Sequence, residues 1–249
     1  MRNTSTASWR TASQLPPPLS SADVTAVVAA AGSGERLGAG GPKAFVPLAG
    51  RPMVEWSIEA LRATASVRSI LLACPPGHGG NFGDGVVVVD GGATRSQSVS
   101  NALAAVETDL VAIHDAARPL LTPKLLEGIV SLLAADPEAA GAIAATPVTD
   151  TVKRQTKAAS TTLEGANAAF VIAETLDRAG LWAAQTPQVF RTAALRAALE
   201  VDAAARDAAT DEAMLVEAAG MRVLIHPSSP RNLKVTTPHD LRLAELLLA

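Results

Sequence analysis

Residues 24–50 of the chain read VTAVVAAAGSGERLGAGGPKAFVPLAG. The apolar run Val24–Ala31 has the length and the flanks of a strand buried in a parallel sheet, and a glycine-rich turn follows it directly. Gly32 and Gly34 can bring backbone N–H groups close to a phosphate chain, because glycine carries no Cβ atom. The stretch therefore predicts an anion-binding turn at the end of the first strand.

This turn matches neither of the two common phosphate-binding signatures. Counted from Gly32, the sixth place of the dinucleotide-binding pattern G-x-G-x-x-G is Leu37. In the Walker pattern a glycine precedes the lysine, whereas Lys43 follows a proline. Arg36 and Lys43 instead lie on a glycine-rich loop, and two cations beside a phosphate-binding turn favour phosphoryl chemistry. The alternative is a surface loop with two solvated charges.

Length and composition predict one α/β domain over residues 23–249. The chain has 249 residues, of which 48% are hydrophobic, and this is enough for a single large core. Its net charge of −3, from 21 basic and 24 acidic residues, gives no overall positive field to hold nucleic acid. Aromatic residues make up 3% and tyrosine is absent, which leaves few stacking platforms for single strands. We therefore expect no polynucleotide partner.

Cysteine use and hydropathy indicate a cytoplasmic protein that does not enter the membrane. The single cysteine, Cys74, rules out an internal disulfide, and we interpret it as a core residue at a strand end. No apolar run approaches the roughly 20 residues that span a bilayer. Residues 1–22 are rich in Ser, Thr and Pro and lack acids, so we expect a disordered tail. A transit peptide or a start codon assigned too early is the alternative.

Apolar runs and helical patterns alternate along the rest of the chain. This alternation predicts a Rossmann-like, mostly parallel central sheet flanked by helices, with a ligand at the carboxyl ends of the strands. Thr122, Thr210 and Thr237 are expected to cap helices, and Gly220 to end one. The later strands are predicted at 67–73, 86–89, 110–113, 140–145 and 221–225, and the helices at 52–61, 123–134, 192–206, 211–219 and from 238.

A second glycine turn opens the run DGGATRSQSVSNAL at residues 90–103. It follows a strand of the same sheet, so we expect it to face the same site as the first turn. Backbone groups near Gly92 and Ala93, with the Ser98 hydroxyl, are candidates to read the edge of a base. Arg95 is expected only to support the turn or the neighbouring loop. The alternative is a structural turn followed by a helix cap.

The run HDAARP at residues 114–119 ends another buried strand. A carboxylate at such a strand end, beside phosphates, holds a metal ion or a ribose hydroxyl, and Asp115 is placed for either. Arg118 is expected to take a phosphate oxygen or to hold the loop by pairing with Asp115. A lone histidine at a strand end is more often scaffold than catalyst, so His114 is interpreted as structural.

Taken in order, these runs resemble the family of 2-C-methyl-D-erythritol 4-phosphate cytidylyltransferases. The resemblance implies transfer of the cytidylyl group of CTP to 2-C-methyl-D-erythritol 4-phosphate. The products would be 4-diphosphocytidyl-2-C-methyl-D-erythritol and pyrophosphate, in the non-mevalonate route to isoprenoid precursors. The matching runs are Ala30–Lys43, 90–103, 114–119, GLWAAQTPQVF at 180–190 and RNLKVT at 231–236.

The resemblance also assigns roles to single residues. Arg36 and Lys43 would be catalytic, because they would hold the α-phosphate and the leaving group. Mg²⁺ is the implied cofactor, with Asp115 as its candidate ligand, and no second acid accompanies Lys234 in its run. Residues implied to position the acceptor are Arg118, Thr151, Arg178, Thr186 and Lys234. Residues implied to bind the nucleotide are Ala30, Ala31, Gly32, Gly34, Gly92, Ala93, Ser98 and Asp115.

The alternation of strands and helices stops over about residues 148–178. Two short extended runs there are joined by a polar segment, whose tip at 155–169 looks longer than usual for the family. The resemblance implies a β-hairpin arm that reaches a second subunit, so that Thr151 and Arg178 complete the partner's acceptor site in a homodimer. A surface loop is the alternative.

Two other functions remain open from the sequence. One is a cytidylyltransferase for another polyol phosphate, such as ribitol 5-phosphate, because few residues define the acceptor pocket. The other is a non-catalytic nucleotide-binding module. Arg36, Lys43, Arg178 and Lys234 together argue against this module, since binding a nucleotide alone needs no acceptor lysine and arginine.

Overall fold

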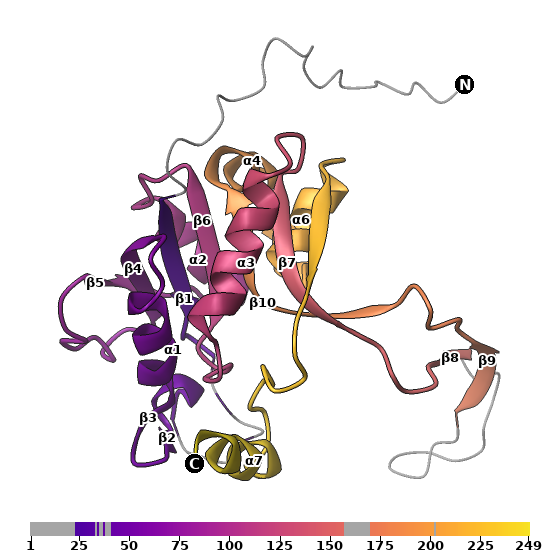
Figure 1. Ribbon diagram of the computed structural model, residues 1–249, viewed down its shortest axis with the longest axis horizontal. Coiled ribbons are helices and arrows are strands. Elements are labelled where there is room, and N and C mark those ends of the chain that lie inside the picture. The colour runs from indigo at the N-terminus through magenta and orange to yellow at the C-terminus, as the bar shows by residue number, and fades with distance from the viewer. Residues whose placement is uncertain (1–22, 33, 35–36, 38–40, 157–169, 202) are drawn as a thin grey trace.

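The computed structural model describes residues 23–249 except 33, 35–36, 38–40, 157–169 and 202, so the predicted tail at 1–22 lies outside the described residues. Within the described part, seven strands form one sheet in the order β11-β7-β10-β6-β1-β4-β5 (Figure 1). Neighbours are parallel except around β10, which confirms a mostly parallel sheet. The strands are β1 (Val24–Ala29), β4 (Val67–Cys74), β5 (Val86–Asp90), β6 (Leu110–Asp115), β7 (Gly141–Pro147), β10 (Trp182–Arg191) and β11 (Val223–Pro227).

Helices cover both faces of this sheet, and the side chains of β1 show how. Val24, Ala26 and Val28 pack into one core with α1 and α3, whereas Val27 packs into a second core with α2, α4 and α6. Successive side chains of a strand point to opposite faces, so a strand covered on both sides reads as one apolar run. The helices are α1 (Met53–Arg62), α2 (Arg95–Leu103), α3 (Pro123–Ala134), α4 (Thr192–Ala198), α5 (Ala203–Ala208), α6 (Glu212–Ala218) and α7 (Pro238–Leu248).

A third, smaller core lies where the last helix meets the start of α1 and a short hairpin of β2 (Pro47–Leu48) and β3 (Arg51–Pro52). Met53, Val235 and Ala244 are buried there. Helix α7 begins with a capping box, because the Thr237 hydroxyl accepts from the Asp240 N–H and the Asp240 carboxylate accepts from the Thr237 N–H. The predicted cap at Thr237 is confirmed. Among the described helices, none combines the length and the apolar character that crossing a membrane requires.

Three further local predictions are confirmed. Thr122 caps α3 by accepting a hydrogen bond of 3.3 Å from the Leu125 N–H. Gly220 follows α6 with a φ of +76°, in the left-handed region that favours glycine. Cys74 is 1% exposed at the end of β4, and burial raises the pKa of its thiol to about 11. A buried thiol with so high a pKa is chemically inert at neutral pH.

Strand β10 was not predicted from the sequence as a strand. It carries Pro187, which has no N–H group for a ladder and argues against a central strand. The structure accommodates this proline at an irregularity, where the pairing of β10 with β7 shifts register between Ala184 and Gln188. On the far side of the shift, Gln188–Arg191 pairs regularly with β6.

The segment after β10 corrects two predictions about helices. The single helix expected at 192–206 is two helices, α4 and α5, separated after Ala198. The sequence contains Asp202 just before α5, and aspartate favours a helix start over a helix interior. Helix α6 is capped by Asp211, which accepts from the Met214 N–H, rather than by Thr210. This shift of one residue makes Glu212 the first residue of α6.

The predicted arm contains a β-hairpin. Strands β8 (Lys153–Thr156) and β9 (Val171–Thr175) pair antiparallel and lie well away from the main sheet (Figure 1). All their residues are exposed, among them the apolar Val171 and Ile172. Most of the predicted tip, 157–169, lies outside the described residues. The role of the arm in a dimer stays a prediction.

We predict that Gly141→Ala destabilises the sheet where β7 meets β10. A Cβ atom at Gly141 would lie within van der Waals overlap of the fully buried Phe190 ring, 2.3 Å from Cδ1. Overpacking of this kind costs about 1–3 kcal/mol. Urea denaturation should show that loss for Gly141→Ala and little change for Gly180→Ala, where a Cβ meets nothing within 4 Å. Equal unfolding free energies for the two variants would contradict the close approach.

Candidate active site

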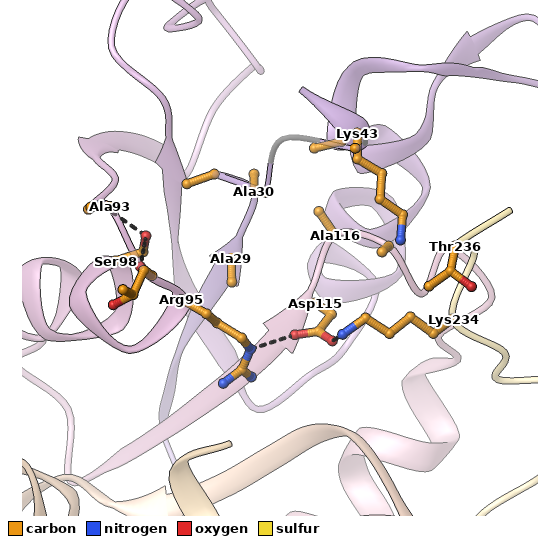
Figure 2. A pocket seen from close by; sticks show the side chains of 17 residues that line it. Ala29, Ala30, Lys43, Ala93, Arg95, Ser98, Asp115, Ala116, Lys234 and Thr236 are labelled. Atoms are coloured by element: carbon orange, nitrogen blue, oxygen red, sulfur yellow. Dashed lines mark hydrogen bonds and ion pairs between the residues drawn. The ribbon is translucent and has the colours of Figure 1, made fainter. Parts of the chain in front are cut away.

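A cavity of about 620 Å³ opens at the carboxyl ends of β1, β5 and β6 (Figure 2). This is the edge at which open α/β sheets bind ligands. Figure 2 shows Lys43 and Lys234 on one side of the cavity, Ala93 on the other and Ala30 between them. The lining residues are Ala29, Ala30, Ala31, Gly32, Gly34, Lys43, Ala44, Gly92, Ala93, Thr94, Arg95, Ser98, Asp115, Ala116, Ala117, Lys234 and Thr236.

The turn after β1 brings Lys43 to the cavity. The Lys43 N–H donates to the Gly32 carbonyl oxygen at 3.1 Å, so the loop folds back onto the turn from which it starts. Gly34 adopts a φ of +75°, and a Cβ atom there would lie 2.9 Å from the Lys43 Cβ. Glycine is therefore needed both for the backbone conformation and for the space. Arg36, the other predicted catalytic residue, lies outside the described residues.

The second glycine turn is held by its own helix. The Gly92 N–H donates to Ser98 Oγ at 2.9 Å, Ser98 Oγ donates to the Thr94 carbonyl, and the Ala93 N–H donates to Gln97 Oε1. Thr94 in turn caps α2. The Ser98 hydroxyl thus serves the turn and the helix start, as the structural alternative expected.

Asp115 joins two cations at the floor of the cavity. Its Oδ1 accepts from Arg95 Nε at 2.9 Å and its Oδ2 lies 2.7 Å from Lys234 Nζ (Figure 2). The residue is 6% exposed, and burial alone would raise the pKa of its carboxyl. The charges and hydrogen bonds of Arg95 and Lys234 outweigh burial and hold that pKa well below its usual range. Asp115 is therefore a carboxylate at neutral pH.

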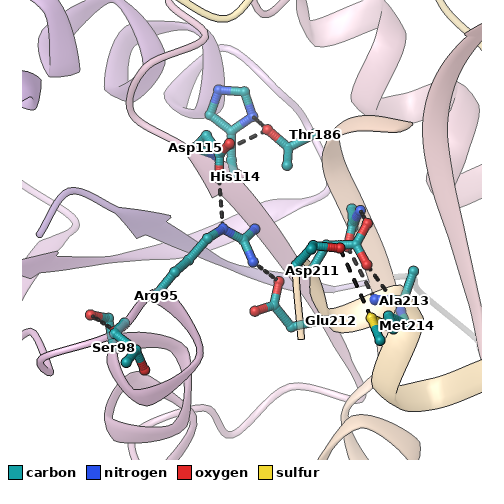
Figure 3. Close-up of polar contacts among 12 residues, drawn as sticks. Arg95, Ser98, His114, Asp115, Thr186, Asp211, Glu212, Ala213 and Met214 are labelled. Atoms are coloured by element: carbon teal, nitrogen blue, oxygen red, sulfur yellow. Dashed lines mark hydrogen bonds and ion pairs between the residues drawn. The ribbon is translucent and has the colours of Figure 1, made fainter. Parts of the chain in front are cut away.

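Arg95 also pairs with a second acid, which sequence reasoning missed. Its Nη1 lies 2.5 Å from Glu212 Oε2, so the guanidinium is shared between Glu212 and Asp115 (Figure 3). Glu212 is 0% exposed and does not line the cavity. Burial lowers the pKa of Arg95, but the two carboxylates reverse this and hold it above its usual value. Burial also raises the pKa of Glu212 above its usual range, while the charge and the hydrogen bond of Arg95 lower it and favour the carboxylate form. Arg95 therefore does more than support its own turn.

A hydrogen-bonded network behind Asp115 fixes its backbone. Thr186 Oγ1 accepts from the Asp115 N–H at 3.0 Å and lies 3.2 Å from His114 Nδ1 (Figure 3). On the other side of the ring, His114 Nε2 lies 3.1 Å from the Arg118 carbonyl oxygen. A carbonyl can only accept, so Nε2 carries the proton and Nδ1 accepts from the Thr186 hydroxyl. Burial lowers the pKa of His114 to about 4, so the ring is neutral. His114 is structural, as expected.

Two residues predicted to position the acceptor lie behind the cavity. Thr186 is 4% exposed and its hydroxyl belongs to the network just described. Arg118 is 8% exposed and donates to the carbonyl oxygens of Asn232 at 2.7 Å and Ala184 at 3.4 Å. Arg118 thus holds the loop through backbone carbonyls and ties it to the segment that carries Lys234. Neither residue lines the cavity.

The structure does not bring the arm residues to this cavity within one chain. Thr151 and Arg178 are exposed at the base of the arm, where Arg178 Nη1 donates to the Thr149 carbonyl oxygen. Of the remaining predicted site residues, the structure brings together ten around the cavity. They are Ala30, Ala31, Gly32, Gly34, Lys43, Gly92, Ala93, Ser98, Asp115 and Lys234.

Metal ligands are sparse in this site. Over the part of the chain that the structure describes, no group of three or more His, Cys, Asp or Glu side chains is arranged to hold a metal ion. Asp115 is the acid of the cavity lining, and each of its oxygens already contacts a cation. The described residues therefore do not by themselves form a multi-carboxylate metal site.

The neutral His114 predicts a pH-dependent stability. Its pKa is about 4 in the folded chain against about 6.5 when unfolded, so the unfolded chain binds the extra proton between these values. The stabilisation of the folded chain by this neutral imidazole is complete above pH of about 6.5. It is lost as pH falls toward about 4, at up to about 1.4 kcal/mol per pH unit. Urea denaturation from about pH 7 to about pH 5, without divalent cations, should give a flatter slope for His114→Gln than for wild type. Identical slopes would contradict a buried neutral imidazole.

Comparisons with known proteins find relatives over nearly the whole chain. A family model described as 2-C-methyl-D-erythritol 4-phosphate cytidylyltransferase matches residues 24–249. The enzyme of that name from Ralstonia nicotianae is 42% identical over 241 residues, covering 90% of this chain and 91% of the relative. The one from Bordetella petrii is 43% identical over 230 residues, covering 88% and 96%.

Solved structures of the same enzyme share the fold. The crystal structure from Thermus thermophilus superposes with a TM-score of 0.73 at 33% identity, covering 90% of this chain and 98% of that chain. The crystal structure from Francisella tularensis has a TM-score of 0.74 at 27% identity, covering 90% and 99%. The family match and the relatives show that this chain belongs to the 2-C-methyl-D-erythritol 4-phosphate cytidylyltransferase family.

Proposed function

We propose that the protein transfers the cytidylyl group of CTP to 2-C-methyl-D-erythritol 4-phosphate and releases pyrophosphate, as a cytoplasmic enzyme of isoprenoid precursor synthesis. One observation in the structure carries this function. The Ala93 turn forms one side of the cavity, and the other side carries the cations Lys43 and Lys234, with the glycine turn after β1 between them (Figure 2). We assign the base to the Ala93 side. A nucleoside triphosphate has the same polarity, with its base at one end and its charge at the other.

The chemistry requires charge stabilisation rather than proton transfer. The acceptor phosphate attacks the α-phosphorus of CTP in line, and negative charge develops on the transferred group and on the leaving pyrophosphate. A phosphate monoester is already largely ionised at neutral pH, so it needs no general base. Lys43, together with Arg36, would stabilise the developing charge, and the turn at Gly32 and Gly34 would supply backbone N–H groups.

Lys234 would hold the acceptor phosphate. Its ammonium is fixed by Asp115 at one side of the cavity, where a second phosphate can approach the α-phosphorus. A cation held in place costs no reorganisation when the acceptor binds. Arg178 and Thr151 are proposed to complete this subsite from the arm of a second subunit, because both are exposed on the arm and distant from the cavity of their own chain.

A divalent cation such as Mg²⁺ is also part of the proposal. When bound, it would neutralise charge on the phosphates of CTP. The ion would be held mainly by those phosphates and by water, because each oxygen of Asp115, its predicted ligand, already contacts a cation.

The reaction is tested by measuring pyrophosphate release with Mg²⁺ and CTP, with and without 2-C-methyl-D-erythritol 4-phosphate. We expect release to require both substrates and to fail with UTP. Lys43→Ala should lower kcat by about 10²–10³-fold, because a preorganised donor to the transition state is lost. Lys124→Ala, which removes an exposed lysine of α3, serves as the control. Pyrophosphate release only with ribitol 5-phosphate would show that the acceptor substrate is a different polyol phosphate. No release with any combination of nucleotide and acceptor would contradict the proposed function.

The shared acceptor site predicts complementation between inactive variants. Lys234→Ala and Arg178→Ala should each be nearly inactive, yet co-expression should restore about a quarter of wild-type activity, since half the dimers are mixed and each has one intact site of two. The pair Lys43→Ala and Lys234→Ala is the control, because both residues line the cavity of one chain and no mixed dimer has an intact site. Failure of the first pair to recover would place the acceptor site within a single subunit.

A further inference from the structure

We infer that Glu212, which lies outside the cavity, is a positioning residue for the acceptor subsite and acts on Lys234 through Arg95 and Asp115. This inference rests on the proposed function for its kinetic test. The four side chains form one chain of alternating charge, with contacts of 2.5 Å from Glu212 to Arg95, 2.9 Å from Arg95 to Asp115 and 2.7 Å from Asp115 to Lys234. Figure 2 shows the contacts of Asp115 with Arg95 and Lys234, and Figure 3 shows the contacts of Arg95 with Asp115 and Glu212.

Glu212 is the rigid end of this charge chain. It is the first residue of α6, is 0% exposed, and is followed by Ala213, Leu215 and Val216, which are buried in the core on that face of the sheet. Lys234 is the exposed end, with 42% of its side chain accessible. A long lysine side chain has many rotamers, so its position in the cavity depends on what holds its ammonium. Here three successive contacts connect the Lys234 ammonium to Glu212, which is buried in the core.

The sharing of Arg95 explains why Glu212 matters to Lys234. A guanidinium that faces one carboxylate favours two parallel hydrogen bonds. Arg95 instead gives Nε to Asp115 and Nη1 to Glu212, which leaves its Nη2 and Glu212 Oε1 buried without a hydrogen-bond partner among the described residues. Without the charge of Glu212, Arg95 can turn both bonds onto Asp115. That turn draws the Asp115 carboxylate away from Lys234.

A merely structural Glu212 would have a different signature. If it only neutralised the buried Arg95, its loss would lower stability and affect both substrates alike. If it positions Lys234, its loss affects the acceptor most, because Glu212 reaches the cavity through Arg95 and Asp115, and Asp115 pairs with Lys234. The ratio of effects on the two substrates separates the two roles.

The kinetic test is Glu212→Gln, which keeps the shape and removes the charge. We expect kcat/KM for the acceptor to fall by about 10- to 100-fold, as for misplacement of a group that orients a reactant, and KM for CTP to stay within about twofold. Asp211→Asn is the matched control, because Asp211 caps the same helix and bonds to Gln188 without a contact to Arg95. Equal changes for both substrates, or the same acceptor defect in the control, would overturn the inference.

A second comparison tests the route through Arg95. In an Arg95→Met background, adding Glu212→Gln should change kcat/KM for the acceptor by less than about twofold, since coupled residues are not additive. If Glu212→Gln lowers kcat/KM for the acceptor equally in wild type and in Arg95→Met, Glu212 does not act through Arg95.

A third readout does not depend on turnover and separates this inference from the proposed function. The ammonium ¹⁵N signal of Lys234, assigned by its loss in Lys234→Met, should shift in Glu212→Gln and remain unchanged in Asp211→Asn. An unshifted signal would overturn the inference even in an active enzyme. A shifted signal would support it even if wild type released no pyrophosphate.

Discussion

The contact on which this site depends is the carboxylate of Asp115 held between two cations. Burying a carboxylate is costly, and the cost is offset only when the charge is paired with good geometry. Here Arg95 comes from α2, Asp115 from the end of β6 and Lys234 from the segment before α7, so one carboxylate joins three parts of the chain. The floor of the cavity is therefore set by electrostatics as much as by packing.

The groups around Asp115 are suited to hold charge rather than to move protons. Asp115 stays ionised at neutral pH, and His114 stays neutral and faces the scaffold, so neither changes its protonation state in that range. Thr186 accepts from the Asp115 N–H, and Arg118 donates to the Asn232 carbonyl oxygen, so both side chains support the backbone. Such a site suits a reaction in which an ionised phosphate is the nucleophile, because fixed charges stabilise the transition state without reorganising.

The features of the fold and site that could be predicted from the sequence are those that depend on residues close together in the chain. The turn after β1 and Asp115 at the end of β6 could be predicted, because an apolar run and the residues directly after it decide both. The pair of Arg95 and Glu212 could not, since 117 residues separate them and an acid at a helix start usually faces water. The motifs marked Ser98 as a ligand-facing residue, yet its hydroxyl satisfies backbone groups of its own turn, a need that appears only once the turn is built.

The antiparallel strand β10 follows from where the arm leaves the body. Strand β7 runs toward the edge that carries the cavity, and its last residue, Pro147, pairs with Trp182 at the start of β10. A chain that leaves at that edge and returns at the same edge can rejoin the sheet without a crossover only as an antiparallel neighbour. The returning strand then carries Thr186 to the backbone of Asp115. Strands β7 and β10, which flank the arm, thus form the ladder that also carries the support behind the cavity, although the hairpin of the arm is a separate sheet. This explains why an otherwise parallel sheet accepts a reversed strand next to its functional edge.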